Sequence, residues 1–186
     1  MGFIEIILIV LGWFVLKFGI LNHTSFETSF LAGIIYNYTA LIIIAIVCVY
    51  RGIKEHSSTP PFLDAFKSIA KKVLTYSVLA SLSITAWHHY IIQDINAKRL
   101  EEIIYEKQNA FESDKEYAEF VIENPDLQKL SREEWIEKET ESVKKIYSMG
   151  IQTSLTMMLY LVMGLFISLI ASFLWTKVWF TQQRQN

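Results

Sequence analysis

Two charged side chains, Glu5 and Lys17, lie inside an apolar stretch where they could do chemistry. Ionisable groups within a membrane segment are functional candidates by default, because they are costly to place in lipid. The two residues are 12 positions apart, which corresponds to about 18 Å along a helix axis. Each lies near one end of the stretch, so we expect both side chains to extend to the membrane surface rather than to form a proton or ion pathway.

Three further polar residues could bind a ligand: Asn37, His88 and His89. Asn37 could contact a substrate, but an amide in a membrane helix is more typical of a hydrogen bond to a neighbouring helix. Adjacent histidines point about 100° apart on a helix, so they do not form the i, i+4 pair that binds zinc. Trp87 and Tyr90 beside them indicate an aromatic belt at the membrane interface, and a pH-sensing or metal-binding role is the alternative.

Several classes of function are excluded by what the sequence lacks. Cys48 is the single cysteine, so it has no disulfide partner and is expected to pack. No glycine-rich phosphate loop, Gly-x-Ser-x-Gly elbow or Asp-x-Asp-x-Asp-Gly calcium loop is present. The net charge of −2 and a basic cluster beside an apolar span argue against nucleic-acid binding. We therefore expect no catalytic residue, no cofactor and no metal ligand.

Apolar helices must position these residues. Hydrophobic residues make up 52% of the chain and the mean hydropathy is +0.30, while residues 94–145 carry 24 of the 36 charged side chains. A bilayer-spanning helix needs about 20 apolar residues, and four stretches approach or exceed that length: Phe3–Leu21, Phe30–Tyr50, Val73–Ile92 and Ile151–Trp175. The sequence therefore predicts an all-α polytopic membrane protein. A bundle of four transmembrane helices would comprise 1–93 and 148–186, with a charged helical hairpin, 94–147, inserted between helices three and four.

The basic residues predict the orientation of this bundle. Five of them lie in the 51–72 segment, whereas the 22–29 turn has none: Arg51, Lys54, Lys67, Lys71 and Lys72. Because short cytoplasmic loops are rich in Lys and Arg, both termini are expected in the cytoplasm and 94–147 outside it. Within 51–72, Thr59 is expected to cap an amphipathic turn that begins at Pro60 and leads into the third span.

The charged insert carries repeated helix signals. Leu100, Ile103, Ile104 and Phe111 form one apolar stripe, so the third helix is expected to continue beyond the membrane surface. Capping-box spacing occurs at Ser113–Glu116 and again at Ser131–Glu134. The apolar stripes are too thin to build an independent core in about 50 residues, so another surface is expected to cover them. The predicted partner-docking residues are Ile103, Phe111, Phe120 and Trp135.

Small residues recur at every fourth position on the third and fourth spans. The predicted helix-packing residues are Ser77, Ser81 and Thr85 on one span, and Gly164, Ser168 and Ser172 on the other. Such spacing lets two helix backbones approach closely in lipid, where no hydrophobic effect drives helices together. Since these two spans flank the insert, we expect them to be antiparallel neighbours.

Three short motifs resemble those of a known family. They are Gly52-Ile53-Lys54 after an apolar span, Phe62-Leu63-Asp64-Ala65-Phe66 before the next span, and Trp87-His88-His89-Tyr90 at its end. With the charged insert and Met157–Leu174, they make residues 30–175 similar to a family of small four-span bacterial membrane proteins of the Bacteroidetes group, a domain of unknown function. The chain departs from that pattern at Pro60-Pro61 and in its N-terminal span. The resemblance implies a bacterial inner membrane, with 94–147 in the periplasm, and supplies no mechanism.

The expected function is therefore a non-enzymatic accessory or scaffolding subunit of an inner-membrane complex, whose helical hairpin contacts a partner. Expected partners are membrane lipids and another membrane or periplasmic protein, and a homo-oligomer is possible. One alternative is a small transporter or channel component formed by oligomerisation, which a water-filled cavity at Asn37 would favour. Another is a membrane enzyme acting on lipid headgroups, which a carboxylate converging on His88 or His89 would favour.

Overall fold

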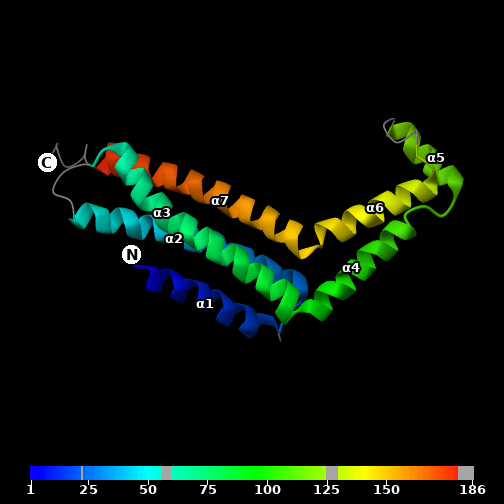
Figure 1. Cartoon of the computed structure of the whole chain (residues 1–186), viewed down its shortest axis with the longest axis horizontal. Coiled ribbons are helices and arrows are strands. Elements are labelled where there is room, and N and C mark those ends of the chain that lie inside the picture. The colour runs from blue at the N-terminus through cyan, green and yellow to red at the C-terminus, as the bar shows by residue number, and fades with distance from the viewer. Residues whose placement is uncertain (22, 56–59, 125–129, 180–186) are drawn as a thin grey trace. The chain divides into compact units, whose positions relative to one another are not determined.

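The computed structural model describes residues 1–21, 23–55, 60–124 and 130–179 (Figure 1). Every regular element in these residues is helical, which agrees with the predicted all-α class. The elements in chain order are α1 (Phe3–Leu21), α2 (Phe26–Glu55), α3 (Phe62–Ala86), the π-helical turn η1 (Trp87–Ile91), α4 (Gln93–Gln108), α5 (Asp114–Glu123), α6 (Arg132–Ile146), α7 (Met149–Phe173) and the π-helical turn η3 (Leu174–Trp179).

Three helices are long and apolar enough to cross a membrane: Phe3–Leu21, Phe26–Glu55 and Met149–Lys177. The first coincides with the predicted N-terminal span, and the other two are longer than predicted. The sequence predicts four spans, but α3, although 25 residues long, is not apolar enough to be among them. Its charged first turns and the hydroxyl side chains that follow lower its hydropathy below that of the other three.

The start of α3 differs from the sequence prediction. Pro60 and Pro61 precede the helix, which begins at Phe62, so Pro60 is not its first residue. The Pro61 carbonyl accepts hydrogen bonds from the backbone N–H groups of Asp64 at 3.0 Å and Ala65 at 3.1 Å. Thr59, the predicted cap, lies outside the described residues. The amphipathic turn expected before the third span is instead the first part of one continuous helix.

The chain divides into two compact units. Unit 1 comprises Met1–Ser83 and Thr156–Asn186, and unit 2 comprises Ile84–Leu155. The boundaries fall within α3 and α7, so unit 1 holds α1, α2 and most of α3 and α7. Unit 2 holds η1, α4, α5 and α6 with the adjoining helix ends.

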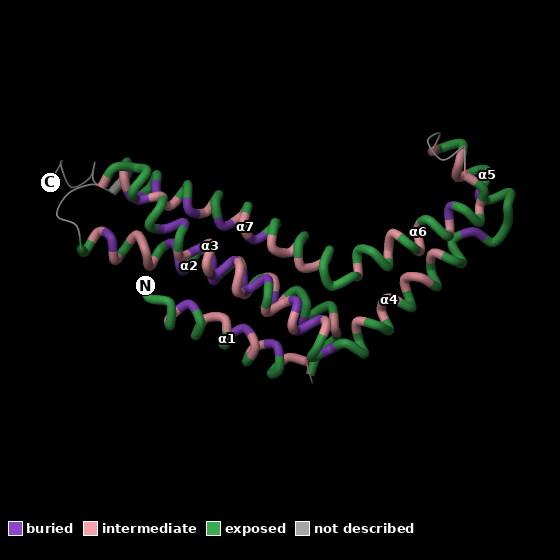
Figure 2. The backbone as a smooth tube through the Cα atoms, in the orientation of Figure 1, coloured by how far each residue is buried: buried purple, intermediate pink, exposed green. Residues whose placement is uncertain are grey.

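Within unit 1, α3 buries a larger share of its residues than the other helices, and its buried positions recur along its length in Figure 2. They are Ala65, Ile69, Ala70, Val73, Tyr76, Ser77, Ala80 and Ser81. By contrast, α1, α2 and α7 expose many large apolar side chains, such as Ile4, Ile46 and Phe166. A helix that is covered by others can carry serines and a tyrosine hydroxyl, because protein groups bond to them. This location accounts for the lower hydropathy of α3.

Candidate functional site

Glu5 and Arg51 form an ion pair between the start of α1 and the last turns of α2. Arg51 Nη2 donates to Glu5 Oε1 at 2.7 Å and Arg51 Nη1 donates to Glu5 Oε2 at 3.1 Å. This two-bond geometry is the strongest form of an arginine–carboxylate contact. Both side chains keep a little over two-fifths of their surface exposed. Glu5 therefore joins two helices, a role that its position in the sequence did not reveal.

Lys17 points into the α1–α2 contact instead of extending outward. Its side chain is 3% exposed, and Nζ donates to the Ser29 carbonyl and to Ser29 Oγ, each at 2.8 Å. The ammonium also lies 5.9 Å from the centre of the Trp13 ring. Space for this arrangement comes from Gly33, where a Cβ atom would lie 3.3 Å from Lys17 Cδ. The snorkelling expected from the sequence is therefore not observed, because Ser29 offers closer acceptors.

A buried hydrogen-bond network joins α2, α3 and α7 at Asn37. Tyr76 Oη donates to Asn37 Oδ1 at 2.7 Å, and Asn37 Nδ2 donates to Tyr160 Oη at 3.3 Å. Ser77 Oγ lies 3.0 Å from the Tyr160 carbonyl and donates to it. Asn37, Tyr76 and Tyr160 are at most 3% exposed. The Asn37 amide thus accepts a hydrogen bond from α3 and donates one to α7.

The six small residues at every fourth position are all buried. A Cβ atom on Gly164 would lie 2.9 Å from Ser77 Oγ and 3.1 Å from Val73 Cγ1, so α3 and α7 approach closely here. Further along α7, Ser168 and Ser172 donate to carbonyls four residues earlier in their own helix. Ser81 donates in the same way to the Ser77 carbonyl at 2.8 Å. Thr85, in unit 2, lies 2.9 Å from Thr153 Oγ1.

His88 and His89 lie in η1, a π-helical turn. Such turns are frequent at functional sites. His88 is 5% exposed, and His89 Nε2 lies 2.7 Å from the Gln152 amide oxygen of α7. Tyr90 donates to the Met149 sulfur at 3.7 Å. No group of three or more His, Cys, Asp or Glu side chains within the described ranges could hold a metal ion. Within unit 2, η1 therefore contacts the start of α7 through His89 and Tyr90, and it also contacts α4.

The apolar stripe predicted to extend the third helix is interrupted twice. After η1, Ile92 adopts φ −115° and ψ 32°, which is outside the helical region, and α4 then begins at Gln93. The second interruption is the end of α4 at Gln108, so Phe111 lies beyond that helix in the connection to α5. The prediction of one continuous helix through Phe111 is therefore wrong, although Ile103 does lie on α4 and is half-buried.

Aromatic side chains pack together where α4, α5 and α6 meet. Phe111, Tyr117 and Trp135 are each at most 8% exposed, and Phe120 packs against them. The ring of Phe111 lies 5.0 Å from Trp135 and 5.2 Å from both Tyr117 and Phe120, at the tilted and edge-on angles that aromatic pairs prefer. We call these four residues the aromatic cluster. Three of the four predicted docking residues thus cover one another, and no partner is needed to bury them.

Hydrogen bonds and ion pairs complete this packing. Ser131 and Glu134 form a full capping box at the start of α6, as predicted. Ser113 Oγ accepts from Glu116 N–H at 3.3 Å, but the Glu116 carboxylate accepts from Glu112 N–H instead of closing the predicted box. Between α4 and α6, which run side by side in Figure 1, Lys107 binds Glu139 at 3.0 Å and lies 5.7 Å from the centre of the Trp135 ring.

Arg132 joins the same region, and sequence reasoning did not single it out. Its guanidinium donates to the Phe111 carbonyl and contacts Asp114 at 3.4 Å, while Tyr117 Oη donates to the Leu130 carbonyl at 3.0 Å. These bonds satisfy backbone carbonyls in the loops that enclose the cluster. We call α4, α5 and α6 with their connections the head. The Arg132 and Tyr117 contacts thus hold parts of the head to one another.

Comparison with known proteins identifies a family. A model of the family DUF4199, described as a protein of unknown function, matches residues 1–177. The chain therefore belongs to this family, and the match includes the N-terminal helix that the resemblance at 30–175 left out. Neither a curated protein nor a solved structure matches the chain.

Proposed function

We propose that the protein is a non-enzymatic accessory or scaffolding subunit of a bacterial inner-membrane complex, with the head as the element that contacts a partner. The observation that carries this proposal is the self-supporting packing of the head: an aromatic cluster, a capping box and the Lys107–Glu139 pair hold short, highly charged helices together. A preformed surface binds a partner without the entropy loss of ordering itself.

Contacts inside unit 1 support four membrane crossings. Glu5, at the start of α1, binds Arg51, and Trp175, after the end of α7, packs against Gly52. The first helix thus starts, and the last helix ends, at the end of unit 1 where α2 terminates. An odd number of crossings would separate those ends. α3 therefore supplies the fourth crossing, and its burial among the apolar helices explains how it does so with a lower hydropathy.

The basic residues support the orientation. Arg51 and Lys54 lie in the last turns of α2, and Lys67, Lys71 and Lys72 lie in the first half of α3. We place these helix ends in the cytoplasm with both termini. The head, 94–147, is then periplasmic. An impermeant maleimide tests this in a Cys48→Ala background: it should label Asn109→Cys in intact cells, and Glu55→Cys only after permeabilisation. The reverse labelling would contradict the orientation.

The two most exposed large hydrophobic side chains of the head could reach a partner. Tyr105 on α4 is 68% exposed beside Glu101, Glu102 and Glu106, and Ile122 on α5 is 74% exposed. Aromatic residues are enriched in protein interfaces, whereas Glu is depleted from their centres. We therefore place the contact at these two residues with the acidic side chains around it, and keep the aromatic cluster as its support.

Site-specific photo-crosslinking of the full-length protein in native membranes tests this function. A photoreactive residue at Tyr105 or Ile122 should give adducts with one and the same protein. The same residue at Leu165, exposed on α7, is the control and should give lipid adducts only. The Trp135→Ala variant should lose the protein adducts, because the head loosens. Absence of a protein adduct from both head positions would contradict the proposal.

The contacts of the polar membrane residues favour packing over transport or lipid chemistry. The Asn37 amide is hydrogen-bonded to Tyr76 and Tyr160, and the Lys17 ammonium is hydrogen-bonded to Ser29. His89 meets the amide of Gln152. These partners fix how the helices sit against each other, which is the requirement of a scaffold.

A further inference from the structure

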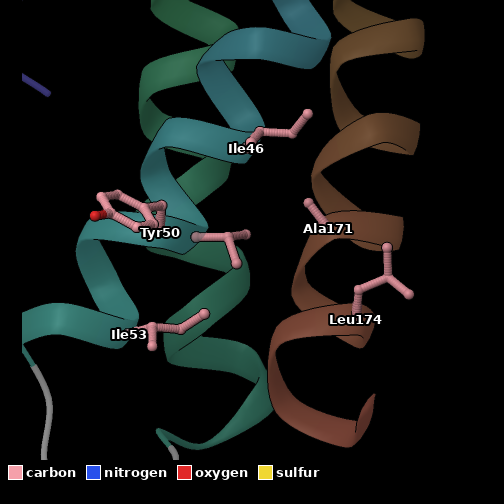
Figure 3. A pocket seen from close by; sticks show the side chains of 6 residues that line it. Ile46, Tyr50, Ile53, Ala171 and Leu174 are labelled. Atoms are coloured by element: carbon pink, nitrogen blue, oxygen red, sulfur yellow. The ribbon is translucent and has the colours of Figure 1, made fainter. Parts of the chain in front are cut away.

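An apolar groove lies between the C-terminal part of α2 and the segment where α7 ends and η3 begins (Figure 3). Its volume is about 250 Å³, and it is lined by Ile46, Val49, Tyr50, Ile53, Ala171 and Leu174. In Figure 3 the Tyr50 hydroxyl points away from the opposite helix, so the groove itself presents hydrocarbon. Ile46, Tyr50 and Leu174 remain at least half exposed, which means that unit 1 leaves the groove open at its surface.

Gly52 explains why the two helices stay together beside this groove. A Cβ atom at Gly52 would clash with the ring of Trp175, so only glycine lets the indole rest on the α2 backbone. Trp175 is 3% exposed and follows Leu174 directly. The indole thus fixes the spacing of the helices at the level where Ile53 and Leu174 face each other.

Positive charge surrounds the terminal end of the groove. Lys54 follows the lining residue Ile53, is exposed, and holds its ammonium 5.5 Å from the centre of the Tyr50 ring. The helix ends and first α3 turns on this side carry three acidic and six basic side chains, which are Glu5, Glu55 and Asp64 against Arg51, Lys54, Lys67, Lys71, Lys72 and Lys177. Arg51 is paired with Glu5, and Lys54 adjoins the lining residue Ile53 and lies over the ring of the lining residue Tyr50.

We propose that this groove binds an acyl chain of an anionic phospholipid, whose phosphate contacts Lys54. Hydrocarbon walls suit the chain, and the excess of basic residues at one end suits the headgroup. The volume of about 250 Å³ is close to the lower limit of about 300 Å³ for small-molecule pockets, so it accommodates part of one chain. Its six lining residues offer far less surface than the roughly 1,200 Å² that a stable interface with a second copy would bury.

The assignment gives each residue of the Gly52-Ile53-Lys54 motif a role. Gly52 admits Trp175, Ile53 lines the groove, and Lys54 supplies the cation. The site requires that α2 and α7 lie in a membrane, but it does not depend on what the head binds. Its failure and the failure of the head's proposed role are therefore distinguishable.

Native mass spectrometry of the full-length protein in micelles tests the site. Micelles supplemented with dioleoyl phosphatidylglycerol or dioleoyl phosphatidylcholine should yield protein retaining one lipid, with phosphatidylglycerol preferred. Lys54→Gln should lower the phosphatidylglycerol preference about fivefold, the effect of one lysine near an anionic surface. The matched control Lys115→Gln removes the same charge from α5, which belongs to unit 2 and contributes nothing to the groove, and should leave the preference unchanged.

Filling the groove provides the second arm. Ala171→Phe, or Ala171→Leu if the larger variant fails to fold, should reduce retention of both lipids, whereas Val162→Phe on the exposed face of α7 should not. Circular dichroism checks that each variant is folded. Equal phosphatidylglycerol preference in Lys54→Gln and wild type would overturn the headgroup contact. Unchanged lipid retention in the Ala171 variants would overturn the groove, as would a dimer that these variants dissociate.

Discussion

Unit 1 buries a few polar side chains among apolar helices, whereas the head buries a few aromatic side chains among charged helices. In unit 1 the bonds of Lys17 with Ser29, and of Asn37 with Tyr76 and Tyr160, determine which helix faces meet. In the head the four rings of the aromatic cluster have that role. The two regions therefore reach a unique packing with opposite kinds of side chain.

The surrounding medium accounts for this difference. Apolar surfaces gain little by meeting each other in lipid, so helix pairing there depends on close backbone approach and on hydrogen bonds. In water, burying an aromatic side chain is strongly favourable, while hydrogen bonds compete with solvent. A charged helix such as α6 can therefore be held by one tryptophan, whereas α3 needs small residues and several polar contacts.

The largest expected effect comes from removing Trp135. Trp135→Ala should destabilise the head by about 3–5 kcal/mol, because a large ring leaves a cavity at the centre of the aromatic cluster. Hydrogen exchange should then quicken throughout α4 and α6 and stay unchanged in α1 and α2. Ile122→Ala, which truncates an exposed side chain, is the control. Equal protection of the head in Trp135→Ala and wild type would show that the cluster does not hold it.

A smaller effect is expected where α3 and α7 approach. Gly164→Leu forces side-chain atoms toward Ser77 and Val73, and overpacking of this kind costs about 1–3 kcal/mol. The melting temperature in detergent should fall, and hydrogen exchange in α3 should rise. Gly150→Leu is the matched control, because nothing lies within 4 Å of the position that its Cβ would occupy. If both variants melted alike, the close approach would not contribute to stability.

The hydrogen bond from Tyr76 to Asn37 should contribute less. Tyr76→Phe keeps the ring and removes the hydroxyl, and the expected loss is about 0.6 kcal/mol, with an upper value of about 1.7 kcal/mol. A double-mutant cycle with Asn37→Leu should show that the two changes are not additive. Tyr105→Phe on the exposed face of α4 controls for loss of a hydroxyl. Full additivity would mean that Tyr76 and Asn37 are not energetically coupled.

Local signals in the sequence were sufficient for part of this structure. The α1 bounds follow from one apolar stretch, and the α6 start follows from Ser131 and Glu134. Contacts between distant residues were not predictable from spacing. The sequence could not indicate that Ser29 lies beside Lys17, or that Phe111 folds back onto Trp135 from a connection.

The same limit applies to the candidate sites. Asn37 was identified as a helix-pairing amide from its type, but Tyr76 and Tyr160 could not be named as its partners. The docking residues were chosen because a thin stripe needs a cover, and the sequence could not show that the cover comes from the head itself. The cover that was expected from another protein is therefore a contact within the chain itself.

The smallest expected effect concerns a surface pair of the head, Glu141 and Lys145. Lys145 Nζ lies 2.9 Å from Glu141 Oε1, and this bond holds the pKa of the Glu141 carboxyl below its ordinary value of 4.5. Because the pKa is lower in the folded state, the stabilisation is fully present above pH 4.5 and is lost as the pH falls through the lowered value. Glu precedes Lys by four residues, which is the favourable order on a helix.

Glu141→Gln should therefore reduce protection of α6 from hydrogen exchange only slightly near neutral pH, and the variant and wild type should converge under acidic conditions. High salt should also remove the difference, because both side chains are exposed and their attraction is screened. The Tyr76→Phe effect should persist at the same salt concentration, since that bond is buried and joins neutral groups. Salt would thus separate an exposed ion pair of the head from a buried, neutral hydrogen bond of unit 1. An α6 difference that survives high salt would show that Glu141 acts through something other than its charge.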